Sequence, residues 1–338
     1  MVTTAAALFG AASRHVRASG ASNNSASSAA SAGSISESGY VPIGGIEQWI
    51  QIRGDDRDNP VLLWLNGGPG YSTIPETARY RQWESPFTLV MWDQRGEGKT
   101  FERSGTSVAP TMTIKRMTED GIEVAEYLCR HLRKRKIILL GHSWGSILGI
   151  HMIKLRPDLF SAYVGTGQIV ELERDAEAAY PLLIERARTL HNTLALKQLE
   201  AVGPPPYPDS PKKWVWISWA NALDPMPPRQ PQTTRPAREN APAYLAEGAD
   251  FSQGLMWNSI MSDDLPKLGL DFKVPIFFIQ GARDDLSVTA LGHQYWRSIR
   301  APEKKFIVLP GAGHLAIFRA RAAFLRQLVK WVRPVAAR

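Results

Sequence analysis

The sequence of 338 residues predicts an α/β fold, in which helices cover both faces of a mostly parallel sheet of about eight strands. Short apolar runs recur along the chain, and helical patterns lie between them. The runs are continuous rather than alternating, which is typical of strands that are buried on both faces. They are Val61–Leu65, Thr88–Trp92, Ile137–Leu140, Ala162–Val164, Ile276–Ile279 and Phe306–Leu309.

The sheet is expected to begin with a hairpin, because the glycine pair in Ile43-Gly44-Gly45-Ile46 favours a tight turn between two short strands. Apolar residues at helical spacing predict helices from Met117 to Leu132 and from Trp144 to Leu155. A third helix is predicted from about Ala316 to the end of the chain. Strands that alternate with helices in this way indicate a parallel sheet between two helical layers.

The strand–helix alternation divides the chain into three parts. Residues 39–167 and 274–338 carry the alternation and are expected to form the core. Residues 168–273 interrupt it with a charged helical stretch from Glu171 to Gln198, a tryptophan cluster and Pro-rich loops, and are expected to form an inserted cap. Residues 1–38, rich in Ala and Ser, are expected to be a disordered tail, with a targeting segment as the alternative.

Composition narrows the classes of function. The chain is 44% hydrophobic and 21% charged, as globular enzymes are, and it has no apolar run long enough to span a membrane. The net charge is +8, but the densest basic run, residues 130–136, lies where a helix end is predicted and lacks interleaved aromatic residues. We therefore expect no nucleic-acid partner and a cytoplasmic location, or export or organelle targeting if the tail is a targeting segment. The sequence makes no prediction of the oligomeric state.

The strongest local motif is Gly141-His142-Ser143-Trp144-Gly145, which lies between a predicted strand and a predicted helix. A nucleophile in this position projects above the sheet from a cramped turn, and the two glycines allow neighbouring backbone to approach. The helix that begins at Trp144 directs its positive end toward the place where an oxyanion would form. The motif predicts Ser143 as a catalytic nucleophile.

A serine hydroxyl needs a base, and in this arrangement the acid and the histidine follow on loops after later strands. The loop after Ile276–Ile279 contains Asp284 and Asp285, and the loop after Phe306–Leu309 contains His314. Neighbouring side chains in an extended chain point in opposite directions, so only one aspartate can face the histidine. We predict Asp284 in that role, with Asp285 facing solvent or accepting a local turn hydrogen bond, and His314 as the base.

A second oxyanion donor is expected from the glycine-rich loop Asn66-Gly67-Gly68-Pro69-Gly70, which follows an early strand. We predict the backbone N–H groups of Gly68 and Trp144 as the oxyanion hole. The loop lacks the Lys-Ser/Thr ending of a phosphate-binding P-loop, so nucleotide binding is not expected.

With these motifs, the chain resembles the proline iminopeptidase family of the α/β hydrolases. The matching segments are Asn66–Gly70, Trp92-Asp93-Gln94-Arg95-Gly96-Glu97-Gly98-Lys99-Thr100 and Gly141–Ser146, followed by the Asp284 and His314 loops. The resemblance runs from about residue 40 to the C-terminus and is poor across the cap. It implies the α/β-hydrolase fold and acyl transfer without a metal or other cofactor. It also implies release of an N-terminal residue, typically proline, from a short peptide or small amide.

Two positions depart from the family pattern. The family usually begins its glycine loop with His, where this chain has Asn66. The family also carries Glu after a Trp pair in the cap to bind the substrate amine, where this chain has Ala220. Glu171, Glu173 and Asp224 are candidates to replace that carboxylate. A carboxylesterase acting on small esters is therefore the first alternative, and a non-catalytic ligand-binding relative is the second.

Overall fold

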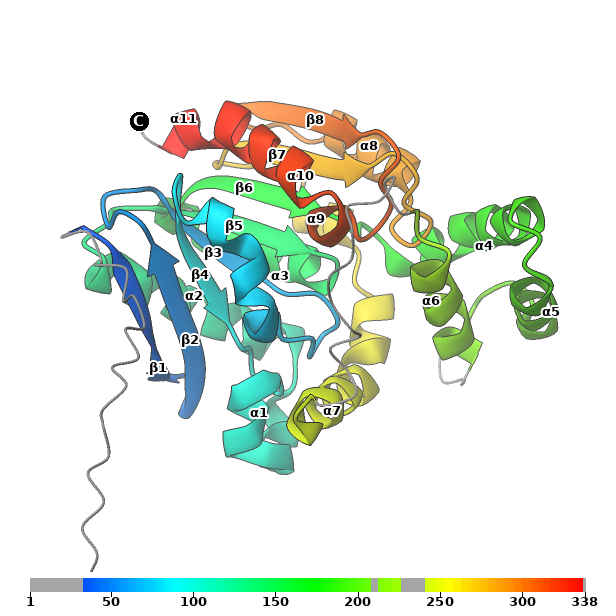
Figure 1. The fold of residues 1–338 in the computed structure, drawn as a ribbon, viewed down its shortest axis with the longest axis horizontal. Coiled ribbons are helices and arrows are strands. Elements are labelled where there is room, and N and C mark those ends of the chain that lie inside the picture. Colours follow the sequence, from blue (N-terminus) through cyan, green and yellow to red (C-terminus); the bar gives the residue numbers. More distant parts are fainter. Residues whose placement is uncertain (1–32, 208–211, 226–240, 337–338) are drawn as a thin grey trace, which may run out of the picture. The chain divides into compact units, whose positions relative to one another are not determined.

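The computed structural model describes residues 33–207, 212–225 and 241–336, and these contain one eight-stranded sheet (Figure 1). The strand order is β1-β2-β4-β3-β5-β6-β7-β8. From β4 onward every neighbouring pair is parallel, whereas β1–β2 and β2–β4 are antiparallel. The number of strands and their mainly parallel arrangement are as predicted.

The sheet begins with the predicted hairpin. Strand β1 (Ile35–Ile43) pairs with β2 (Ile46–Gly54) through the turn at Gly44 and Gly45, both of which have positive φ. The predicted tail was too long by residues 35–38, which lie in β1. Two of these four residues are Ser, so composition gave no sign of a strand, and the segment is held in the sheet by its pairing with β2. The rest of the predicted tail, apart from residues 33 and 34, lies outside the described residues.

The six remaining strands coincide with the six apolar runs, extended by a few residues at their ends. They are β3 (Val61–Leu65), β4 (Thr88–Trp92), β5 (Ile137–His142), β6 (Phe160–Thr166), β7 (Ile276–Gly281) and β8 (Lys304–Leu309). In β3, Leu63 and Leu65 belong to one buried cluster, and Leu62 and Trp64 belong to another. The strand is fully apolar because each face of the sheet has its own core.

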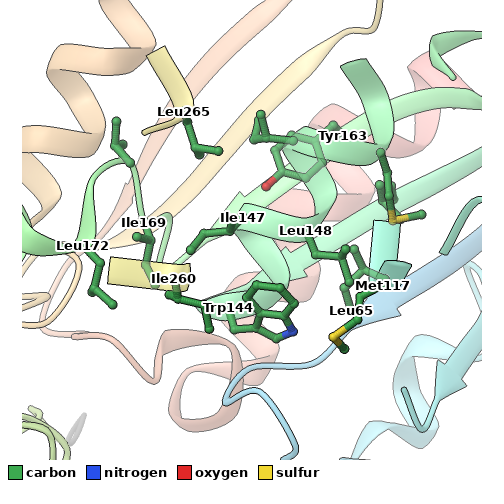
Figure 2. Packing of buried hydrophobic residues seen from close by; sticks show 14 of the residues in the cluster. Leu65, Met117, Trp144, Ile147, Leu148, Tyr163, Ile169, Leu172, Ile260 and Leu265 are labelled. Atoms are coloured by element: carbon green, nitrogen blue, oxygen red, sulfur yellow. The ribbon is translucent and has the colours of Figure 1, made fainter. Parts of the chain in front are cut away.

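Helices complete both cores. The first core contains α2 (Ile114–His131), α3 (Trp144–Leu155) and α8 (Thr289–Ser298). Figure 2 shows Trp144, Ile147 and Leu148 of α3 within this core. The second core contains η1 (Ile74–Trp83) and the C-terminal helices. Short helices connect these elements: α1 (Gly98–Ser104), η2 (Gly105–Thr111) and η3 (Pro157–Leu159).

The helix α2 shows how its ends are fixed. Thr113 precedes it, and the Thr113 side chain accepts a hydrogen bond from the Arg116 backbone N–H. This side chain satisfies one of the donors that a helix leaves free at its start. Arg130 and His131 lie in the last turn, where positive charge is favourable. The basic run at residues 130–136 therefore contains the C-terminal end of a helix, as predicted.

The predicted C-terminal helix is interrupted. It consists of α9 (Ala316–Arg319), α10 (Arg321–Gln327), the π-helical turn η5 (Leu328–Val332) and α11 (Arg333–Ala336). The apolar residues Phe324, Leu328 and Val332 are all fully buried, so the predicted face is correct.

The chain between β6 and β7 is helical, and no strand lies in its described residues. It contains α4 (Leu172–Thr189), α5 (Thr193–Val202), α6 (Lys212–Ala222), α7 (Ala243–Met261) and η4 (Leu265–Leu268). The helical stretch predicted from Glu171 to Gln198 is thus two helices, and Asn192 caps the second by accepting from the Ala195 N–H. Much of the predicted Pro-rich segment lies outside the described residues, and the division into core and cap stays a prediction.

Candidate active site

Ser143 lies at the sharp turn between β5 and α3, with φ 55° and ψ −121°. Positive φ is unfavourable for a residue with a Cβ, so the surrounding structure must hold this conformation. The flanking glycines explain how it does so. A Cβ at Gly145 would lie 2.2 Å from the Leu65 carbonyl oxygen, and one at Gly141 would lie 2.3 Å from the Gly145 carbonyl oxygen. The turn is therefore packed against β3 and leaves Ser143 partly exposed.

The loops after β7 and β8 bring Asp284 and His314 together. His314 Nδ1 lies 3.1 Å from both carboxylate oxygens of Asp284. Asp284 Oδ1 also accepts from the backbone N–H groups of Leu286 and Ser287, at 3.0 and 2.9 Å. Both Asp284 and His314 are buried, so the pair is shielded from water. The predicted preference for Asp284 over Asp285 as the neighbour of His314 agrees with this geometry.

This contact shifts the pKa values of both partners. Burial alone would raise the pKa of Asp284, but the charge and hydrogen bond of His314, with the hydrogen bonds from Leu286 and Ser287, lower that pKa overall. Burial alone would lower the pKa of His314, but the charge and hydrogen bond of Asp284, with a smaller effect of the Asp224 charge, raise that pKa overall. The pair therefore favours an ionised Asp284 and a more basic His314, as an acid–base relay requires.

The end of β6 lies between Ser143 and His314. The Ser143 N–H donates to the Thr166 carbonyl oxygen at 3.1 Å. At the next residue, a Cβ on Gly167 would lie 2.8 Å from His314 Cε1. The His314 loop also contacts the turn directly, because His142 Nε2 is 3.2 Å from the His314 carbonyl oxygen. The serine turn and the histidine loop thus meet at one end of β6.

The glycine-rich loop after β3 lies against the same turn. A Cβ at Gly67 would lie 3.2 Å from the Ser143 Cβ. Gly68 follows with φ 116°, and Gly70, with φ 93°, has no room for a Cβ, which would lie 2.7 Å from Ala249 Cα in α7. The loop is therefore held between the serine turn and α7, with Gly68 one residue beyond the contact with Ser143.

Asn66 links this loop to a buried acid. Its Nδ2 donates to Glu97 Oε1 at 2.5 Å, and its Oδ1 accepts from the Thr73 hydroxyl at 2.6 Å. Burial, and secondly the nearby Asp93 carboxyl, raise the pKa of Glu97 well above its usual value. Burial also raises the pKa of Asp93 to about 6. Asn66 therefore ties the start of the glycine loop to Glu97, one of two neighbouring desolvated carboxyl groups.

Comparison with known proteins assigns the family. The family described as serine aminopeptidase, S33, matches residues 83–319. The chain belongs to the serine aminopeptidase S33 family. It is 29% identical over 309 residues to a Bacillus subtilis protein named probable aminopeptidase YbaC, covering 87% of this chain and 95% of that one. It is 26% identical to a proline iminopeptidase of Lactobacillus helveticus, covering 87% and 97% of the two chains.

A solved structure supports the fold. The proline iminopeptidase-related protein TTHA1809 from Thermus thermophilus matches with a TM-score of 0.62 and 23% identity, covering 89% of this chain and 98% of that one. With the eight-stranded sheet, this match establishes the α/β-hydrolase fold. The family and the named relatives together identify the chain as a hydrolase. Within residues 33–207, 212–225 and 241–336, no helix combines the length and apolar character needed to cross a membrane.

Asp285 differs from the expectation for it. It is 8% exposed, so the prediction that it faces solvent was wrong, and its carboxylate pairs at 2.7 Å with Arg186 of α4 in place of the predicted local turn donor. The physical reason is that α4 packs over the loop and supplies a cation that sequence order does not reveal. Burial raises the pKa of Asp285 to about 6, although Arg186 opposes the shift.

Ser287 is a site residue that the sequence reasoning missed. Its hydroxyl lies 2.8 Å from Asp284 Oδ2 and 3.1 Å from His314 Nδ1, so it contacts both members of the pair. A serine three residues after an aspartate can close a local turn around the carboxylate, and this spacing could have indicated the contact. Asp175 of α4 was also missed. It accepts from the Val288 N–H at 2.8 Å and so holds the other end of the same loop.

The candidate carboxylates for a substrate amine are mostly engaged elsewhere. Ala220, at the family's glutamate position, is buried in α6. Asp224 forms an ion pair of 2.9 Å with Arg319, and Glu171 lies 3.5 Å from Arg174. Glu173 is exposed at the start of α4. Each of the two carboxylates that pair with an arginine already has a counter-ion within the chain.

Proposed function

We propose that the chain is a serine hydrolase that cleaves an amide or ester bond of a small substrate through an acyl-enzyme. Ser143 is the nucleophile, His314 the base and Asp284 the group that orients the imidazole. The observation that carries the proposal is the buried Asp284–His314 contact of 3.1 Å, which meets the strained Ser143 turn at the end of β6.

The mechanism has two steps. His314 takes the proton of the Ser143 hydroxyl through Nε2 as the oxygen attacks the substrate carbonyl, while Asp284 holds Nδ1 and stabilises the imidazolium. The backbone N–H groups of Gly68 and Trp144 stabilise the oxyanion, supported by the N-terminus of α3. The leaving group takes the proton from His314, and water then hydrolyses the acyl-enzyme by the same route in reverse.

The first substrate class is a short peptide or amide from which the N-terminal residue is released. The family and the named relatives support it. An ester substrate is the second class, and a specific feature favours it. The buried Ala220 offers no charge to an N-terminal ammonium, and Asp224 and Glu171 are paired with arginines. A substrate without a free amine would not need that missing charge.

Two measurements test the proposal. Purified protein and a Ser143→Ala variant are assayed with a proline arylamide and with short aryl esters, and both are treated with a fluorophosphonate probe. We expect turnover and labelling in the parent protein and a loss of at least about 10⁴-fold in turnover in the variant. Turnover of esters alone would select the esterase. Folded parent protein that neither labels nor turns over would favour a non-catalytic binder and refute the hydrolytic mechanism.

A further inference from the structure

Asp224 lies two residues beyond the last residue of α6, yet it is buried against the loop that carries His314. The Asp224 side chain is 1% exposed. We propose that Asp224 is a positioning residue for His314, a second carboxylate that fixes the histidine loop and stabilises the protonated imidazole. This inference rests on the proposed function, since it assigns Asp224 to the same relay.

The contact with the loop is close. A Cβ at Gly313 would lie 2.1 Å from Asp224 Oδ1 and 2.5 Å from Pro225 Cδ, so residue 313 must be glycine for Asp224 to approach. Burial raises the pKa of Asp224, and the charges of His314 and Arg319 and the nearby His314 backbone N–H partly oppose that shift. The carboxylate thus acts on the backbone of the histidine, whereas Asp284 contacts its imidazole ring.

Arg319 fixes Asp224 in this place. Its Nη1 donates to Asp224 Oδ2 at 2.9 Å and also to the Asp224 carbonyl oxygen. Its Nη2 donates to the Asn221 carbonyl oxygen at 3.3 Å, so one guanidinium binds the end of α6 at three points. Arg319 is the last residue of α9, five residues after His314. The histidine loop and the end of α6 therefore form one unit.

The charges around Asp224 favour the protonated form of His314. Asp284 acts most strongly, and Asp224 raises the His314 pKa further. Arg319 and His314 supply the positive charge that faces Asp224, while Asp284 supplies negative charge. Arg186 of α4, which forms the ion pair with Asp285, also interacts electrostatically with Asp224. A carboxylate acting in this way has an effect on imidazole basicity that packing alone would not produce.

The test measures the titration of His314 directly. The imidazole signals of the full chain are followed by NMR across pH, with His314→Gln used to assign the resonance among the 7 histidines. In Asp224→Asn, we expect the midpoint of His314 to fall by about 0.5–1 pH unit, because a neutral amide no longer stabilises the imidazolium. Asp271→Asn is the matched control, since Asp271 pairs with Arg300 at the exposed surface, and its midpoint should equal that of the parent.

A second variant covers the case in which Asp224→Asn does not fold. Asp224→Ala removes the carboxylate without leaving a buried amide, while Arg319 stays 24% exposed, and the midpoint of His314 should fall as it does in Asp224→Asn. An unchanged midpoint in the folded variants overturns the inference, whatever happens to stability. The readout needs no substrate. A parent protein without turnover whose His314 midpoint still responds to Asp224 would refute the proposed function alone, and an active enzyme with unresponsive midpoints would refute this inference alone.

Discussion

The raised pKa of Glu97 predicts that this carboxyl takes up a proton when the chain folds, and replacing Glu97 with Gln tests this. Its side chain is fully buried, and Oε1 accepts a hydrogen bond from Asn66 at 2.5 Å. Burial and the neighbouring Asp93 carboxyl raise the pKa of Glu97 well above its usual value. In the unfolded chain the same carboxyl ionises with a pKa of about 4.3. Between these two pKa values, the folded state binds one more proton than the unfolded state.

The sign and size of the effect follow from proton linkage. Because the folded pKa is the higher one, the stabilisation is complete below the unfolded pKa and is lost as pH rises toward the folded pKa. One proton corresponds to about 1.4 kcal/mol in the free energy of unfolding for each pH unit. Gln keeps the shape and the acceptor oxygen but binds no proton. From about pH 5 upward, the free energy of unfolding of the parent should therefore fall relative to that of Glu97→Gln, by up to about 1.4 kcal/mol for each pH unit.

Urea denaturation, followed by tryptophan fluorescence between about pH 5 and pH 8, measures this difference. Glu247→Gln is the matched control, because Glu247 is exposed in α7, and its curve should run parallel to that of the parent. If the difference between Glu97→Gln and the parent is the same at every pH, Glu97 is ionised in the folded protein and the account of this buried pair is wrong.

Three further predictions concern the site. Gly145→Ala should lower the free energy of unfolding by about 1–3 kcal/mol in urea denaturation, because its Cβ would lie 2.2 Å from a backbone oxygen of β3. Gly254→Ala is the control, since nothing lies within 4 Å of its Cβ, and its stability should match that of the parent. Ser287→Ala should lower kcat about tenfold, because it removes a hydrogen bond to the ionised Asp284. An unchanged kcat would contradict a contribution of Ser287 to the Asp284–His314 pair. His314 must be neutral to act as a base, and its pKa is raised from 6.5, so kcat/KM should rise with pH through a midpoint above 6.5. A midpoint below 6.5 would be inconsistent with the Asp284 contact.

The sequence was sufficient to predict the sheet because each central strand has two cores to fill. In β3, alternate residues enter different apolar clusters, so the strand appears as one uninterrupted apolar run. The first residues of strand β1 were not predicted as a strand, because β1 lies at the edge of the sheet, where Ser36 and Ser38 are tolerated. Edge strands are specified more by pairing than by burial, and pairing leaves little trace in composition.

The relation of Asp284 to His314 was predictable for a topological reason. Parallel strands end at one edge of the sheet, so loops after β5, β7 and β8 must lie near one another even though they are far apart in sequence. Glycines around Ser143 and His314 marked where backbone approaches closely. The choice between Asp284 and Asp285 needed only the alternation of side chains in extended backbone, and the 3.1 Å contact agrees with it.

The ion pairs that surround the site follow no such rule. Asp285 pairs with Arg186, and Asp224 pairs with Arg319, 95 residues away. With 40 Lys and Arg against 32 Asp and Glu, a carboxylate has many possible partners, and charge alone selects none of them. The partner is decided by which helix of the segment between β6 and β7 packs over which loop. Asp285 lies on the Asp284 loop and Asp224 contacts the His314 loop, so the packing of that segment also sets the charges around the proposed relay, and the Asp224→Asn titration tests this link.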